Sequence, residues 1–261
     1  MPKIIENRLI KEFKDKGSFT RTELLDFFRQ FEPDLKEGTL AWRIYDLKNR
    51  NIIKPLMRGL YTVSFKPKYN PEISQELYKI ADKISSRFAD IKYCLWETEW
   101  LNEFSQHQSG KKMILVEVEK EFVESFYYDL KDNFKNDIYL NPDEKVINFY
   151  ISESNQPLII KNLVTRSPID MRTERKIEVY TPLLEKILVD LFAEEKLFYL
   201  YRGNELTHIF ENVTKTYAVN FTKLFSYAKR RKKEQEIKMF LTNHIPHLVK
   251  DIIHDYPNLL K

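Results

Sequence analysis

Glycine is scarce in this sequence, with five residues in 261. So few glycines argue against a glycine-rich loop that cradles phosphates, and the chain carries neither a P-loop nor a G-x-S-x-G pattern. It also lacks a glycine-serine pair followed by the paired aspartates that are typical of nucleotidyltransferases. None of these catalytic classes is therefore indicated by a motif.

Cysteine is scarcer still, because Cys94 is the only one in the sequence. A single cysteine cannot form a disulfide within the chain, which fits a reducing compartment. Cys94 lies between Tyr93 and Leu95 in an apolar stretch. We expect it to be packed in a core rather than to act as a reactive thiol.

Long apolar runs are missing as well, and no stretch approaches the length needed to span a bilayer. Lys3 and Glu6 carry charge where a secretory signal would need its apolar core. We therefore expect a cytoplasmic protein that does not associate with a membrane.

What the chain does contain is typical of a globular protein, with 43% hydrophobic, 14% aromatic and 31% charged residues. Its length predicts two domains. Residues 1–70 hold 15 of the 43 Lys and Arg but 9 of the 39 Asp and Glu, so that this segment carries +6 and the remainder −2. Such asymmetry suits a polyanion-binding module joined to a near-neutral partner domain.

Three helices are predicted in the first fifty residues. Apolar residues recur at helical spacing from Ile4 to Phe13, until Gly17 breaks the pattern. Thr20 and Glu23 then match a capping box, in which a hydroxyl and a carboxylate each satisfy a free backbone N–H at the start of a second helix. A third helix is expected from about Glu37 to Arg50, and its buried side is predicted to consist of Leu40, Ala41, Ile44 and Leu47.

Two short strands are predicted next, over residues 52–57 and 60–63, joined by Arg58 and Gly59. Three helices followed by a hairpin is the order of a winged helix-turn-helix. In that fold the third helix enters the major groove of duplex DNA while the hairpin lies along the sugar-phosphate backbone.

On this interpretation, the face of the third helix opposite the core reads DNA. Arg43 is expected to form a bidentate pair with guanine, worth about 1–3 kcal/mol of discrimination, and Thr39 or Trp42 to contact thymine methyls or phosphates. Packing of Trp42 against the wing is the alternative. The cations predicted to neutralise phosphates are Lys36, Lys48, Arg50, Lys54 and Arg58.

Pro67 and Pro71 disfavour regular structure, so we place the domain boundary there and predict domains over residues 1–68 and 69–261. The second domain alternates predicted helices with strands at residues 93–96, 113–118, 137–140, 146–151 and 158–160, and it turns helical from Pro182 onward. The predicted fold class is α+β, an N-terminal winged helix-turn-helix followed by a mixed α/β domain with a helical C-terminal part.

Candidates for catalysis or metal binding are few. The five histidines are His107, His208, His244, His247 and His254; Pro246 disfavours a regular helix between His244 and His247, and no cysteine accompanies them. Restriction-type nucleases hold a metal with an acidic residue and an E-x-K motif, but in Glu117-Val118-Glu119-Lys120 neither glutamate has a lysine two positions on. We expect no catalytic residues, no metal site and no cofactor.

A second cationic feature is a run of five basic residues at the end of a predicted helix. It consists of Lys229, Arg230, Arg231, Lys232 and Lys233. The run predicts a second phosphate contact. A solvated helix end fits it equally well.

Several short segments are similar to one known family. Arg58-Gly59-Leu60-Tyr61 stands at the wing, and Tyr93-Cys94-Leu95-Trp96 leads into Thr98-Glu99-Trp100-Leu101. Residues 182–191, 217–220 and 227–228 follow in the helical part. Together these segments resemble the AbiEi-type antitoxins, whose winged helix ends in an R-G-x-Y hairpin and whose second domain opens with a short strand and helix. The strand-rich stretch from residue 137 to 160 is not matched.

The resemblance implies a transcriptional autorepressor from a bacterial type IV toxin–antitoxin or abortive-infection pair, which binds double-stranded DNA at an inverted repeat upstream of its own gene. Its genetic partner would be a nucleotidyltransferase toxin, and Arg43 and Arg58 carry over as DNA contacts by their position in helix and wing. Two alternatives stay open. One is a nuclease-like enzyme with a DNA-binding winged helix, and the other is a winged-helix module that binds protein.

Overall fold

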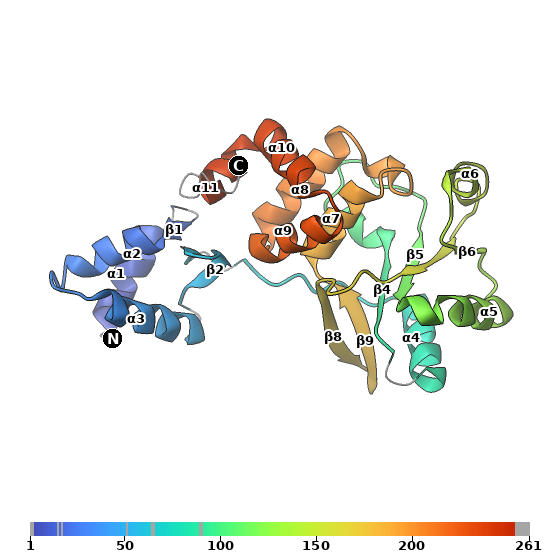
Figure 1. Cartoon of the computed structure of the whole chain (residues 1–261), viewed down its shortest axis with the longest axis horizontal. Helices are drawn as coiled ribbons and strands as arrows, with labels where there is room; N and C mark the ends of the chain where they lie inside the picture. Colours follow the sequence, from blue (N-terminus) through green and yellow to red (C-terminus); the bar gives the residue numbers. More distant parts are fainter. Residues whose placement is uncertain are drawn as a thin grey trace.

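The computed structural model describes residues 3–14, 16, 18–50, 52–63, 66–88 and 91–253, with side chains up to residue 249. The chain is a mixed α+β protein with several small sheets (Figure 1). Gly17 and His254, which the sequence analysis named, lie outside the described residues.

The N-terminal segment folds around three helices and a small antiparallel sheet of order β1-β3-β2. The elements are α1 (Lys3–Phe13), β1 (Phe19–Thr20), α2 (Arg21–Arg29), α3 (Glu37–Asn49), β2 (Lys54–Met57) and β3 (Leu60–Thr62). The predicted capping box is confirmed, since Thr20 Oγ1 accepts the backbone N–H of Glu23 while the Glu23 carboxylate accepts that of Thr20. Gly59 turns the hairpin at φ +80°.

Two separate hydrophobic cores divide the molecule, and the hairpin contributes to both. One core joins α1, α2 and α3 through residues such as Leu9, Phe28 and Leu40. Met57 and Leu60 instead belong to the larger core formed by the rest of the chain. The predicted domain boundary at residue 68 falls in the extended segment that follows, where Pro67 O accepts the backbone N–H of Ala218 at 3.0 Å.

The larger core is built on a four-stranded sheet of order β4-β5-β7-β6, in which β4 is antiparallel to β5 and the other pairs are parallel. The strands are β4 (Tyr93–Glu97), β5 (Ile114–Val118), β6 (Ile138–Leu140) and β7 (Leu158–Asn162), with α4 (Gln75–Arg87), η1 (Thr98–Glu103), η2 (Lys120–Phe122) and α5 (Val123–Asn133) between or before them. Every residue of β5 is buried, so both faces of this strand are covered.

The strand predicted over residues 146–151 is wrong. The chain forms α6 (Glu144–Val146) and a π-helical turn, η3 (Ile147–Ile151), after Asp143 accepts the backbone N–H of Val146 at 2.8 Å. Ile147 and Ile151 are buried four residues apart, which is helical spacing. A run of apolar residues alone did not distinguish this turn from a strand.

A hairpin of β8 (Ile169–Glu174) and β9 (Ile177–Pro182) follows and was not predicted. It turns at Arg175 and Lys176, both at positive φ although neither is glycine. The C-terminal part is helical, as predicted, with α7 (Leu184–Ala193), η4 (Tyr199–Tyr201), α8 (Asn204–Thr216), α9 (Phe221–Arg230), α10 (Glu234–His244) and α11 (Pro246–Ile253).

The helix α7 is the centre of this part, because Leu184 to Leu191 are all buried and α8 and α9 pack against it (Figure 1). Across the described residues, none of the helices combines the length and the apolar character that crossing a bilayer requires.

Candidate nucleic-acid interface

The helix α3 presents a solvent-facing aromatic surface. Leu40, Ile44 and Leu47 point into the N-terminal core, which leaves Trp42 63% and Tyr45 59% exposed on the other side. Ala41, predicted to be buried, is exposed beside them. Tyr45 was not singled out from the sequence, although its position three residues after Trp42 places both on one helix face.

Arg43 lies at the flank of this face and points back toward α2. Its Nη2 is 2.7 Å from each carboxylate oxygen of Glu32, and the guanidinium carbon is 4.9 Å from the centre of the Phe28 ring. The Arg43 side chain is 14% exposed. It therefore joins α2 to α3, and a contact with a base would require it to leave Glu32.

Arg50 is likewise engaged within the segment. Its guanidinium contacts Glu6 of α1 at 2.6 Å and Asp46, one turn earlier in the same helix, at 3.2 Å. Hydrogen bonds to Glu6 and then to Asp46 raise the pKa of Arg50. This predicted phosphate contact thus fastens the end of α3 to α1.

Three of the predicted phosphate-binding cations are open to solvent. Lys36 precedes α3, Lys48 lies in its last turn and Arg58 is in the hairpin turn; all three are exposed and pair with no acidic group in the described part of the chain. Thr39 is exposed in the first turn of α3. Lys36, Thr39, Lys48 and Arg58 are therefore available to a polyanion that approaches α3 and the hairpin turn.

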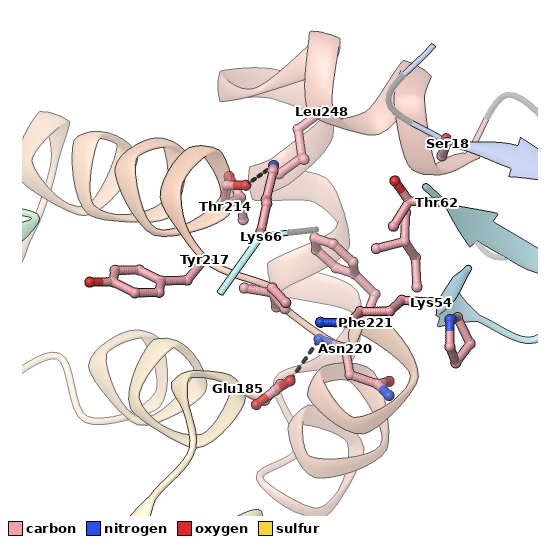
Figure 2. Close-up of a pocket in the computed structure, with 14 residues that line it drawn as sticks. Ser18, Lys54, Thr62, Lys66, Glu185, Thr214, Tyr217, Asn220, Phe221 and Leu248 are labelled. Carbon is pink, nitrogen blue, oxygen red and sulfur yellow. Dashed lines mark hydrogen bonds between the residues drawn. The ribbon is translucent and has the colours of Figure 1, made fainter. Parts of the chain in front are cut away.

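Lys54 is directed differently. It is half-buried on β2 and lines a pocket between the hairpin and the C-terminal helices, together with Asn220 and Phe221 (Figure 2). The hairpin rather than α3 lies toward the larger body of the molecule (Figure 1). The exposed face of α3 is consequently left uncovered.

The basic run at the end of α9 divides into two groups. Lys229, Arg230 and Lys232 are exposed. Arg231 is 16% exposed and pairs with Glu194 at 2.6 Å, while Lys233 contacts Glu236 at 2.6 Å. Although burial opposes it, Asp190 and Glu194 raise the pKa of Arg231. Arg231 thus points into the protein, away from any external phosphate.

Glu117, the acidic residue considered for catalysis, is buried in a network of charges. Residues Glu117 of β5 and Asp190 of α7 both contact the ammonium of Lys186, and Asp190 Oδ1 also accepts the hydroxyl of Tyr227 at 2.8 Å. Cys94 faces Glu117 across the strand pair, and burial raises the pKa of its thiol well above the usual value. The cluster joins the sheet to α7 and α9.

Three of the described histidines lie beside glutamates, and two of these share one carboxylate. His107 lies 3.1 Å from Glu205, whereas His208 and His247 approach Glu211 at 4.0 and 3.9 Å. Within the described ranges, no three His, Cys, Asp or Glu side chains are arranged to hold a metal ion.

Comparison with known proteins identifies a family whose function is unknown. No curated protein matches the chain. The family model that does match begins inside α3, at residue 39, and ends in α11, at residue 247. Because this match covers most of the chain, the protein belongs to the family described as a family of unknown function, DUF6577.

Proposed function

We propose that this protein is a DNA-binding transcriptional regulator whose N-terminal segment acts as a winged helix. The observation that carries the proposal is the uncovered face of α3, where Trp42 and Tyr45 are accompanied by exposed cations in a segment of net charge +6. The order of helices and hairpin supports it, because a winged helix inserts its third helix into the major groove.

The side chains divide into two roles. Trp42 and Tyr45 supply apolar contacts to base edges such as thymine methyls, and Thr39 can donate or accept a hydrogen bond there. Lys36, Lys48 and Arg58 neutralise phosphates and fix the register. Arg43 reaches a guanine only by exchanging its bond with Glu32, so the base contacts are assigned first to the aromatic pair.

The antitoxin role extends this proposal to a biological partner. It rests on the resemblance of the wing and of the β4 segment to AbiEi-type antitoxins, and it implies an operator at the protein's own promoter and a neighbouring nucleotidyltransferase toxin. The identity of the adjacent gene tests this part directly. A neighbour unrelated to nucleotidyltransferases would leave DNA binding as the proposal and remove the antitoxin role.

One other function is favoured by the same surface. Exposed Trp and Tyr side chains are also enriched at the centres of protein–protein interfaces. A winged-helix module that binds protein would use Trp42 and Tyr45 but would not need Lys36, Lys48 or Arg58.

Fluorescence anisotropy with a duplex from the region upstream of the gene tests the proposal and separates the two functions. Trp42→Ala is expected to weaken binding by about 1–3 kcal/mol, because an apolar contact to bases is lost. Lys48→Ala should weaken all duplexes alike and lower the slope of log affinity against log salt by about one. Tyr128→Ala, which removes an equally exposed aromatic ring from α5, is the matched control and should bind like wild type.

Two results would contradict the proposal that the face of α3 binds DNA. One is the absence of any anisotropy change with duplex at low salt. The other is an equal affinity of wild type and Trp42→Ala at every salt concentration.

A further inference from the structure

A pocket of about 180 Å³ lies where the hairpin of the N-terminal segment meets the C-terminal helices. One wall comes from the hairpin, through Lys54, Leu56 and Thr62. The opposite wall comes from Val219 between α8 and α9, from Phe221 at the start of α9 and from Leu248 of α11 (Figure 2). The pocket is therefore shared between the two cores of the molecule.

Eight of the fourteen residues that line the pocket have polar side chains, of which two are cationic and one is anionic. Lys54 and Lys66 line it, against one carboxylate, Glu185. Glu185 Oε1 accepts the backbone N–H of Asn220 at 2.6 Å, and the ammonium of Lys66 donates to Thr214 O. With two lysines and one glutamate, the lining side chains carry a net positive charge, which favours an anion.

Six lining residues are apolar, and the volume of the pocket limits what can enter. At roughly 30 Å³ per water molecule the pocket holds about six, and an apolar cavity of about 150 Å³ is known to accommodate benzene. Apolar walls with a few convergent polar groups are typical of sites for small organic molecules.

We propose that this pocket binds a small aromatic carboxylate, a molecule of one ring and one anionic group. The ring lies between Leu56, Val219 and Phe221, and the carboxylate lies toward Lys54. A ligand in this position contacts the hairpin and α9 at once.

Such a ligand couples to DNA binding, which is the part of the inference that rests on the proposed function. It stabilises one arrangement of the hairpin relative to α9, whose far end carries the exposed cations Lys229 and Arg230. By linkage, DNA affinity then changes when the ligand binds, and ligand affinity changes by the same factor when DNA binds.

Isothermal titration calorimetry of the full chain with benzoate, phenylacetate and the neutral analogue benzamide tests the site. At least one carboxylate is expected to bind with a Kd of about 1 mM or tighter, because a ligand of about ten non-hydrogen atoms can supply the binding free energy that this Kd requires. Benzamide is expected to bind about tenfold more weakly. Lys54→Met should weaken carboxylate binding about tenfold, and Leu248→Trp should abolish it by filling the pocket. Lys79→Met on α4 and Met239→Trp on α10, both exposed positions, are matched controls.

Absence of saturable heat with both carboxylates overturns the proposal. Benzamide binding as tightly as benzoate overturns the anion preference, and unchanged binding to both Lys54→Met and Leu248→Trp places the site elsewhere. Anisotropy with duplex DNA, with and without the bound carboxylate, tests the coupling alone, for which about a fivefold change or more is expected. Carboxylate binding without any DNA binding would contradict the proposed function and leave the pocket assignment standing.

Discussion

Replacing Lys186 by methionine is expected to cause one of the largest losses of stability that a single substitution can cause in this protein. The lysine is completely buried, and its ammonium contacts the carboxylates of Glu117 and Asp190. Although burial opposes it, Asp190 and Glu117 raise the pKa of Lys186 well above its usual value, so the side chain is charged in the fold. Lys186→Met fills a similar volume but removes the cation from Glu117 and leaves Asp190 with Arg231 alone, at 3.7 Å.

Breaking a buried ion pair by removing one partner costs about 3–5 kcal/mol. For a protein of this size about 1 kcal/mol corresponds to about 2–4 °C, so the melting temperature should fall by about 6–20 °C. The control is Lys196→Met, since Lys196 and Glu144 pair at 3.0 Å with both side chains more than half exposed. That substitution should cost little stability, because solvent screens an exposed ion pair.

The pH dependence of the loss provides a second readout. Burial raises the pKa of Glu117, so without Lys186 this carboxylate can reduce the penalty by taking up a proton, and the difference between variant and wild type should shrink as pH falls from about 7 toward 5. Urea denaturation followed by circular dichroism at several pH values measures both effects. A cost for Lys186→Met within about 1 kcal/mol of the Lys196→Met cost, or a difference that does not change with pH, would refute this reasoning.

Three further outcomes are expected. Thr20→Ala removes the hydroxyl that accepts the Glu23 N–H at 3.1 Å, and urea denaturation should show a loss of about 0.5–2 kcal/mol; no loss would mean that the capping box does not stabilise α2. Glu32→Gln should strengthen DNA binding about threefold or more in anisotropy, because the substitution weakens the hold on Arg43 and removes a negative charge near the phosphates of the proposed duplex. An unchanged affinity would exclude Arg43 from the interface. Although burial opposes it, hydrogen bonds from His107 and Gln106 lower the pKa of Glu205, so the stability that its carboxylate contributes is lost as pH falls below about 4.5. The melting temperatures of wild type and Glu205→Gln should therefore converge below that pH. A constant difference in melting temperature down to about pH 3 would contradict the lowered pKa.

The elements that sequence patterns predicted well are those whose signal is local. The capping box at Thr20, the helical spacing of Leu40, Ile44 and Leu47 and the apolar strands β4 and β5 all appear where expected. Helical period and cap chemistry are properties of neighbouring residues, so they can be recognised without a tertiary structure.

What could not be predicted depends on distant residues. Glu32 and Phe28, which lie before α3 in the sequence, hold the Arg43 side chain away from the exposed face of the helix. The β8–β9 hairpin turns on Arg175 and Lys176, which carry none of the usual turn chemistry. Lys186 sits in an apolar helix, and its partner Glu117 is 69 positions away in the sequence. The pocket likewise forms only when the hairpin meets α9.

Met57 and Leu60 join the N-terminal segment to the larger body of the molecule, because both side chains belong to the larger core. Each side chain is buried, and exposing an apolar side chain of this size costs about 1.5–3 kcal/mol, so lifting the hairpin off costs about 3–6 kcal/mol. At about 1.4 kcal/mol per tenfold, fewer than about one molecule in a hundred is undocked at any moment. A fragment truncated after the hairpin would expose these two apolar side chains to solvent and would tend to aggregate. The N-terminal segment is therefore held to the rest of the chain by packing and not only by the covalent linker.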